Sequence, residues 1–177
     1  MIERISYKIV PFYASLLTLY YLLLTYRAIS VRRKYLVALG DGTLEYISGV
    51  EKRRSESSVD SSVTQMIAEN PLSKSKLDYN QFRHFQRNNR AHGNFAENVP
   101  LALLLLFFIE VNNYISPFWL HVACGNLLLG RIIHGDLAFN LFANHLAVNK
   151  WRPIGVSINL IVLTFAALVN GYNFLSS

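Results

Sequence analysis

The feature that most restricts the fold of this chain is an uncharged, apolar run from Ile9 to Tyr26, IVPFYASLLTLYYLLLTY. A helix of about 18 residues is just long enough to cross the hydrocarbon core of a bilayer, which is about 30 Å thick. A signal peptide is the alternative, but no small-residue cleavage site follows, and the basic cluster comes after the run instead of before it. Because 52% of the chain is hydrophobic, we predict an integral membrane protein with this run as its first span.

Three further segments fit the same interpretation. Val99–Ile109 is uniformly apolar but too short to cross alone, so we extend its helix back to about Gln81 through a polar portion. A third span covers Ser116 to about His134, and a fourth runs from about Ile154 to Phe174. The prediction is an all-α fold, in which residues 1–177 form a single domain, a bundle of four transmembrane helices.

The segment from Tyr46 to Asp78 differs in composition from the rest of the chain. It has EKRRSESSVDSSV at its centre and NPLSKSK near its end, so serine and charged residues dominate it. Such a composition cannot bury enough apolar surface to fold alone. We predict a flexible loop, inserted between the first and second helices, whose serines are candidate phosphorylation sites.

The basic residues lie almost entirely on one side of the four-span topology. Of the 17 Lys and Arg residues, 15 lie either between Arg27 and Arg90 or around the loop between the third and fourth spans, and only Arg4 and Lys8 lie on the other side. The positive-inside rule then places both loops in the cytosol and both termini on the far side. Since basic residues beside membrane helices act as topology signals and contact anionic lipid, we do not expect nucleic-acid binding.

Cysteine usage and the N-terminal sequence limit the chemistry and the location. Cys124 is the single cysteine, so no intrachain disulfide forms, and we expect no metal site because no ligand-spaced cluster accompanies it. The N-terminus has neither an Arg- and Ser-rich transit leader nor a cleavable signal. We therefore expect the endoplasmic reticulum or another endomembrane, then the mitochondrial outer membrane, and the inner membrane if the source is bacterial.

Polar residues form a stripe in the second predicted helix. Arg90, Asn94 and Glu97 stand at i, i+4 and i+7, within about a sixth of the helix circumference. A charged residue costs about 2.5–3.5 kcal/mol at the centre of a membrane helix, so the stripe must face protein or water. Arg90 and Glu97 either neutralise each other or lie at the interface, or all three residues line a pocket for a zwitterionic, peptide-like ligand.

The sequence RAHGNFAENVPLALLLL resembles the R-x-x-x-N-x-x-E-x-x-P signature of the MAPEG family, membrane-associated proteins in eicosanoid and glutathione metabolism. VRRKYLVALGDG, after the first predicted helix, is similar to a stretch in the bacterial, YecN-like branch, and GRIIH resembles a third-helix segment of several members. The resemblance implies a four-helix bundle that assembles as a trimer and holds glutathione between subunits near the cytosolic face. The implied glutathione-binding residues are Arg90, Asn94, Glu97, Arg131 and His134.

The resemblance also implies a mechanism, in which an arginine stabilises the thiolate of glutathione for attack on a lipophilic electrophile or peroxide. That arginine stands near the start of the fourth helix in the family, and Arg152 is the nearest candidate, although Gly155 aligns more closely with the position. The chain departs from the family at two further positions, since many members have tyrosine at the position of Asn98 and some have tyrosine at that of Ala138. From the signature and the mechanism that it implies, the predicted function is a glutathione transferase or peroxidase of the membrane.

Two alternatives stay open. One is a non-catalytic MAPEG-like membrane protein that has lost turnover, which Asn98, Ala138 and Gly155 favour. The other is a small channel or transporter, which depends only on polar residues within the spans.

Overall fold

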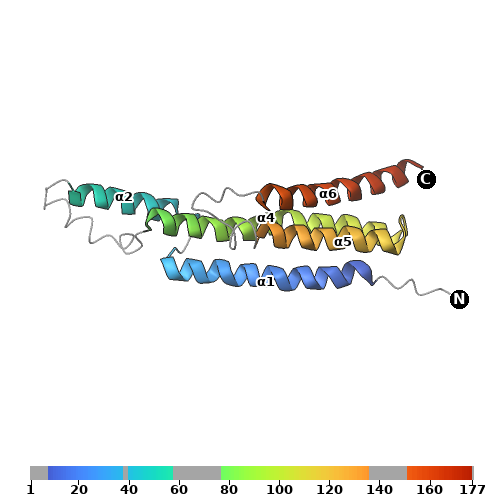
Figure 1. Cartoon of the computed structure of the whole chain (residues 1–177), viewed down its shortest axis with the longest axis horizontal. Coiled ribbons are helices and arrows are strands. Elements are labelled where there is room, and N and C mark those ends of the chain that lie inside the picture. Colours follow the sequence, from blue (N-terminus) through green and yellow to red (C-terminus); the bar gives the residue numbers. More distant parts are fainter. Residues whose placement is uncertain (1–7, 38–39, 58–76, 136–150, 177) are drawn as a thin grey trace. The chain divides into compact units, whose positions relative to one another are not determined.

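The structure is a computed structural model that describes residues 8–37, 40–57, 77–135 and 151–176 (Figure 1). The chain divides into two compact units, Met1–Leu23 with Ala91–Ser177 and Leu24–Arg90. The described residues contain no strand, which confirms the all-α prediction for them. The helices are α1 (Ile9–Tyr35), α2 (Thr43–Ser57), α4 (Tyr79–Val111), α5 (Pro117–Ile132) and α6 (Trp151–Ser176).

Three helices among the described residues are long and apolar enough to cross a membrane, namely α1, α4 and α6. They coincide with the first, second and fourth predicted spans. The third predicted span coincides with α5, whose 16 residues rise only about 24 Å at about 1.5 Å per residue. The helical path continues as a π-helical turn through residues 133–135. The structure therefore supports three candidate spans and does not confirm the count of four.

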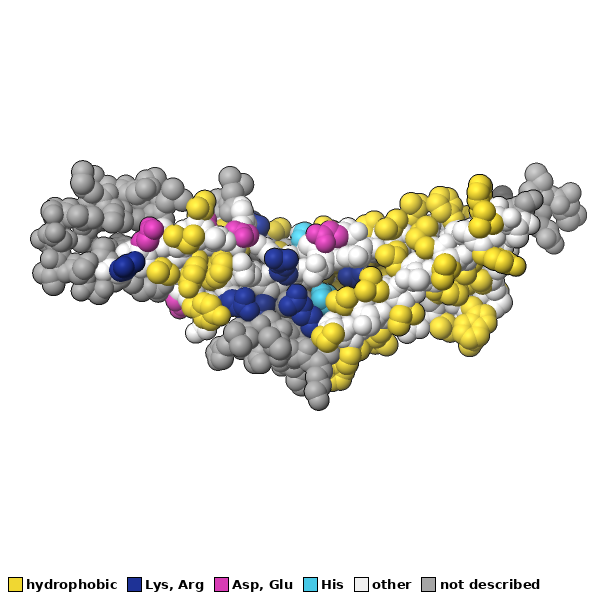
Figure 2. Space-filling view, turned by 90° about the horizontal axis from the view of Figure 1, so that it is seen from above, with side chains coloured by type: hydrophobic (Ala, Val, Ile, Leu, Met, Phe, Trp, Pro, Cys, Tyr) yellow, Lys and Arg dark blue, Asp and Glu magenta, His cyan; other side chains and the backbone are white. Residues whose placement is uncertain are grey.

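The first unit buries several polar side chains within its mainly apolar interior and exposes large apolar side chains. Leu160, Ile161 and Leu168 of α6 are 53%, 67% and 68% exposed, whereas Arg131 and His134 are 6% and 4% exposed. Figure 2 shows apolar side chains gathered over the face that α6 presents. Because hydrocarbon is the favourable solvent for such a surface and polar groups within it need internal partners, this distribution is that of an integral membrane protein.

A carboxylate from α4 caps the first turn of α1. Glu110 Oε1 accepts hydrogen bonds from the backbone N–H groups of Lys8 and Ile9, at 3.0 and 2.8 Å, and Oε2 accepts one from Val10 at 3.0 Å. Helix N-termini carry unpaired N–H groups and a partial positive charge, and a carboxylate compensates both. The first unit thus joins the start of α1 to the end of α4 by a buried, charge-assisted contact.

Helices α5 and α6 approach each other closely at two glycines of the first unit. A Cβ atom on Gly155 would lie 2.7 Å from the backbone nitrogen of His134 and 2.9 Å from the carbonyl oxygen of Gly130. A Cβ atom on Gly130 would in turn lie 3.0 Å from Asn159 Oδ1. The absence of side chains at these two positions therefore lets α6 lie directly against the end of α5.

The second unit contains a helix in the segment that the sequence predicts as a loop. Residues from Tyr46 to Ser57 belong to α2, and the rest of the predicted loop up to residue 76 lies outside the described residues. Asp41 precedes the helix and caps it, because its Oδ1 accepts a hydrogen bond from the Thr43 N–H at 3.0 Å. The pKa of Asp41 lies below its ordinary value, mainly because the Thr43 side chain donates a hydrogen bond to the carboxylate, and secondly because the Thr43 backbone N–H does so.

Aromatic packing explains why α2 forms despite its polar composition. Tyr46 stacks on Phe82 with ring centroids 4.6 Å apart, next to a buried cluster of Val31, Val37, Leu77 and Phe85. The sequence analysis missed this apolar side of the helix because it used the composition of the whole segment, which is dominated by the serine and charged residues from Glu51 onward. The correction is that the insertion starts with an ordered helix that packs within its own unit.

Loss of the Glu110 carboxylate is expected to destabilise the first unit. Glu110→Ala leaves three N–H groups of the first turn of α1 without their acceptor, at a cost of about 2–3 kcal/mol. Thermal unfolding in detergent, followed by circular dichroism, measures the change. Glu51→Gln, which alters an exposed carboxylate in α2, is the control. An unchanged midpoint for Glu110→Ala would contradict the role of this cap.

The contact between α5 and α6 predicts opposite effects for two glycine substitutions in the same helix. Gly155→Ala must push α6 away from the backbone of α5, which costs about 1–3 kcal/mol. Gly171→Ala meets nothing within 4 Å, and the better helix propensity of alanine gains up to about 1 kcal/mol. Thermal unfolding of the two variants side by side tests the contact, and equal midpoints would count against it.

Candidate functional site

A cavity of about 260 Å³ lies within the first unit, between α4, the end of α5 and α6. Its volume is just below the usual range for small-molecule sites, about 300–1,000 Å³. Polar groups come from all three helices, so the cavity is a polar site inside an apolar bundle. The residues that line it are Asn94, Asn98, Ala102, Leu127, Arg131, His134, Arg152, Val156, Asn159, Leu160 and Leu163.

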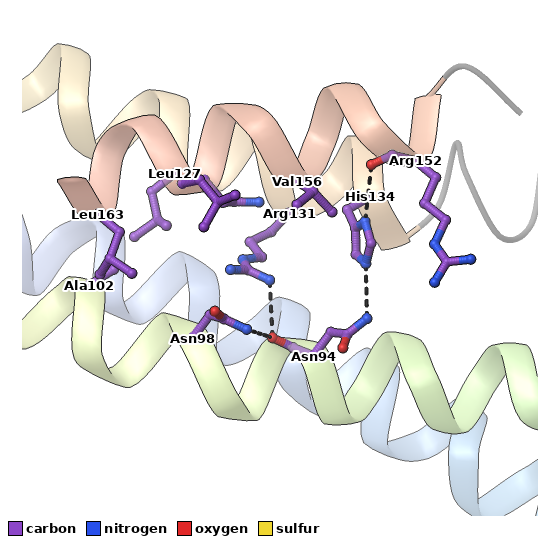
Figure 3. A pocket seen from close by; sticks show the side chains of 11 residues that line it. Asn94, Asn98, Ala102, Leu127, Arg131, His134, Arg152, Val156 and Leu163 are labelled. Carbon is purple, nitrogen blue, oxygen red and sulfur yellow. Dashed lines mark hydrogen bonds between the residues drawn. The ribbon is translucent and has the colours of Figure 1, made fainter. Parts of the chain in front are cut away.

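His134 connects the three helices around the cavity (Figure 3). Its Nε2 lies 3.1 Å from Asn94 Nδ2, and its Nδ1 lies 3.5 Å from the carbonyl oxygen of Arg152. A carbonyl oxygen only accepts and an amide nitrogen only donates, so the two contacts together select the tautomer with its proton on Nδ1. The imidazole is therefore held in one orientation at the wall of the cavity.

Arg131 places a guanidinium in the interior of the unit. The residue is 6% exposed, and its Nη1 donates a hydrogen bond to the carbonyl oxygen of Asn94 at 3.1 Å. Among the described residues its Nε is buried without a hydrogen-bond partner. A buried N–H with no acceptor is costly, and here it belongs to a residue that lines the cavity. The arrangement can bind an anion or another acceptor.

Two asparagines that the sequence analysis did not assign to a site complete the polar wall. Asn98 Nδ2 donates to the carbonyl oxygen of Asn94 at 2.9 Å, and Asn159 Nδ2 donates to that of Gly155 at 2.7 Å. Asn159 Oδ1 is buried and has no partner among the described residues. The polarity of Asn159 inside an apolar helix is a signal of the site, but it is not a specific one. Amides within membrane helices also form interhelical hydrogen bonds, as Asn170 does with the Leu105 carbonyl oxygen at 3.0 Å.

The structure brings together four of the six residues that the sequence predicts for the site. Asn94, Arg131, His134 and Arg152 all line the cavity. Arg90 and Glu97 do not line it, and both are exposed in the single chain. Ala138, a position used in the sequence argument, lies outside the described residues. The glutathione-binding and catalytic roles stay predictions.

Helical geometry explains why the signature stripe divides in this way. The buried face of α4 includes Ala91, Phe95 and Ala102. At about 100° per residue the centre of that face lies roughly 80° around the helix from Asn94 and still farther from Arg90 and Glu97. On α4 the cavity is lined by Asn94, Asn98 and Ala102, at one side of that buried face, whereas Arg90 and Glu97 lie farther around the helix and are exposed.

Comparison with known proteins gives a consistent result. The model of the MAPEG family matches residues 10–172. Inner membrane protein YecN of Escherichia coli strain K12 is 32% identical over 90 residues, which are 50% of this chain and 63% of the relative. YecN of E. coli O6:H1 strain CFT073 matches with the same identity and coverage. The matched region is thus less than two thirds of the length of these relatives, and no solved structure matches the chain.

The apolar exterior, the three candidate spans and the polar cavity fit these matches. Because the family model covers nearly the whole described chain, this integral membrane protein belongs to the MAPEG family.

Proposed function

We propose that this protein is a membrane-bound, glutathione-dependent transferase or peroxidase that acts on lipophilic electrophiles or lipid hydroperoxides. The observation that carries the proposal is the buried guanidinium of Arg131, which lines a cavity that is polar at one end and apolar at the other. A reaction between a polar peptide thiol and a lipophilic partner requires such an arrangement, since both must meet away from bulk water.

The polar groups of the cavity complement the groups of glutathione. The tripeptide has two carboxylates, one ammonium and a thiol. Arg131 and Arg152 provide cations for carboxylate or thiolate, and Asn94, Asn98 and Asn159 provide amides for the peptide groups. Glu97, which is exposed one position before Asn98 of the lining, is a suitable acceptor for the ammonium.

The limited volume of the cavity supports a site that a second copy of the chain completes. About 260 Å³ is small for a whole tripeptide. The side chains of Arg90 and Glu97 are exposed in the single chain, and such charges would be costly against lipid. We therefore propose a homotrimer of four-span subunits, in which α5 with its π-helical extension is the remaining span, and in which Arg90 and Glu97 contact ligand held between subunits.

The proposed chemistry begins with the thiolate of glutathione. In transfer, sulfur donates an electron pair to an electrophilic carbon, a C–S bond forms, and a leaving group departs with its electrons or an adduct takes up a proton. In peroxide reduction, two glutathione thiols become a disulfide while one hydroperoxide becomes an alcohol and water. The membrane in which this occurs is proposed to be an endomembrane, or the inner membrane in a bacterium, as for YecN.

A non-catalytic binding protein is the second candidate function. It is favoured by Gly155, where the first turn of α6 has no room for a side chain, and by Asn98, which lines the cavity where a tyrosine hydroxyl would stand in many members. Such a protein would bind glutathione without thiolate formation or turnover.

Binding of glutathione is the first test. Isothermal titration of the full chain in detergent is expected to show saturable binding, weakened about tenfold or more by Arg152→Ala or by Arg90→Ala, because each removes a charge-assisted contact. Arg33→Ala, at an exposed position near the end of α1, is the matched control and is expected to leave affinity unchanged. Wild-type protein that binds no glutathione at millimolar concentration would overturn the proposal.

Turnover separates the two candidate functions. Conjugation of a lipophilic electrophile and reduction of a lipid hydroperoxide are measured on the same preparation, with glutathione saturating. Binding together with either activity supports the enzyme, whereas binding without either supports the non-catalytic protein.

A further inference from the structure

The cavity has a polar end and an apolar end, and Arg131 lies where they meet. In Figure 3, Ala102, Leu127 and Leu163 lie on one side of the Arg131 guanidinium, and His134 and Arg152 lie on the other. The two arginines are therefore not equivalent. One stands at the boundary between polar and apolar surfaces, and the other stands at the far polar end.

The boundary is the place where the proposed reaction would occur. The thiol-bearing part of the tripeptide fits the polar end while the rest extends out of the cavity, and the tail of a lipophilic electrophile fits the apolar end. The sulfur must then lie at the junction, within reach of the reacting carbon. A cation that stabilises the thiolate must be there as well, because electrostatic stabilisation falls with distance.

The contacts of Arg131 suit this task. Its Nη1 is fixed by the carbonyl oxygen of Asn94 at 3.1 Å, which orients the planar guanidinium. Its buried Nε has no hydrogen-bond partner among the described residues, so a sulfur atom bound beside it would supply the missing acceptor. Burial strengthens an ion pair, since fewer water molecules screen it. Arg152 is exposed, and it suits a carboxylate at the polar end of the cavity.

The first turn of α6 offers no other cation to the junction. Gly155 lies between Arg152 and the apolar end, and a side chain there would meet the backbone of His134 and Gly130. Val156 follows and is apolar. The charge at the junction therefore comes from α5.

We infer that Arg131, and not Arg152, is the residue whose guanidinium faces the thiolate sulfur, with Arg152 binding a carboxylate of the same ligand. This assignment rests on the proposed function. The thiol proton passes to solvent at the polar end, Arg131 stays protonated throughout, and the sulfur electron pair forms the new bond.

The experiment compares substitutions of the two arginines in the full-length protein in detergent. Ultraviolet absorbance of bound thiolate is recorded at saturating glutathione across a pH series, with S-methylglutathione as the reference that has no ionisable thiol. Arg131→Gln is expected to lower the thiolate fraction at neutral pH by about tenfold, the equivalent of one pKa unit. Arg152→Gln is expected to weaken the binding of both ligands about tenfold and to leave the thiolate fraction at saturation unchanged.

The conservative pair keeps the test decisive if Arg131→Gln does not fold. Arg131→Lys retains the charge but removes the Nε–H, so the pH midpoint of thiolate formation moves upward, whereas Arg152→Lys leaves the midpoint unchanged. The inference is overturned if Arg152 substitutions, and not those of Arg131, change the thiolate signal. Wild-type protein that binds no glutathione would overturn the proposed function, and this assignment with it.

Discussion

The close contact between α5 and α6 is the interaction on which the site depends. Gly130 and Gly155 bring two backbones together without intervening side chains. This contact places the π-helical turn with His134 beside the first turn of α6, where the Arg152 carbonyl oxygen meets the imidazole. It also turns Arg131 toward α4. In a membrane, where lipid competes equally well for apolar surfaces, small residues of this kind allow helices to pack tightly.

Much of the fold was predictable because hydrocarbon imposes simple rules. Apolar length located α1 and α6, and α4 followed once its short apolar run was extended back through polar residues, because a membrane span must be helical over its whole length. The polar stripe of α4 pointed to the site for the same reason, since lipid excludes it. Arg131 and His134 were implied by the family resemblance, and the structure places His134 Nε2 3.1 Å from Asn94 Nδ2 of that stripe.

The remainder depended on contacts that periodicity does not contain. The cap of α1 by Glu110 joins residues about 100 positions apart, so nothing local to either segment indicates it. The spacing of Arg90, Asn94 and Glu97 gave a shared stripe, but which side of that stripe faces the cavity depends on where α5 and α6 pack. Helix α2 was missed because composition was averaged over a segment that starts with an Asp41 cap and a stacked Tyr46.

The family resemblance aligns Gly155 most closely with the position of the family's catalytic arginine, and the structure explains why this chain has glycine there. No side chain fits there, because the position is occupied by the backbone of α5. Arg131 of α5, in contrast, is 6% exposed, so its guanidinium lies in the interior. Burying a guanidinium at membrane depth costs several kcal/mol, which the Asn94 carbonyl oxygen, its hydrogen-bond acceptor among the described residues, offsets only in part. An anionic ligand beside the unpaired Nε would offset the rest, and the thiolate of the proposed ligand carries the charge that this position requires.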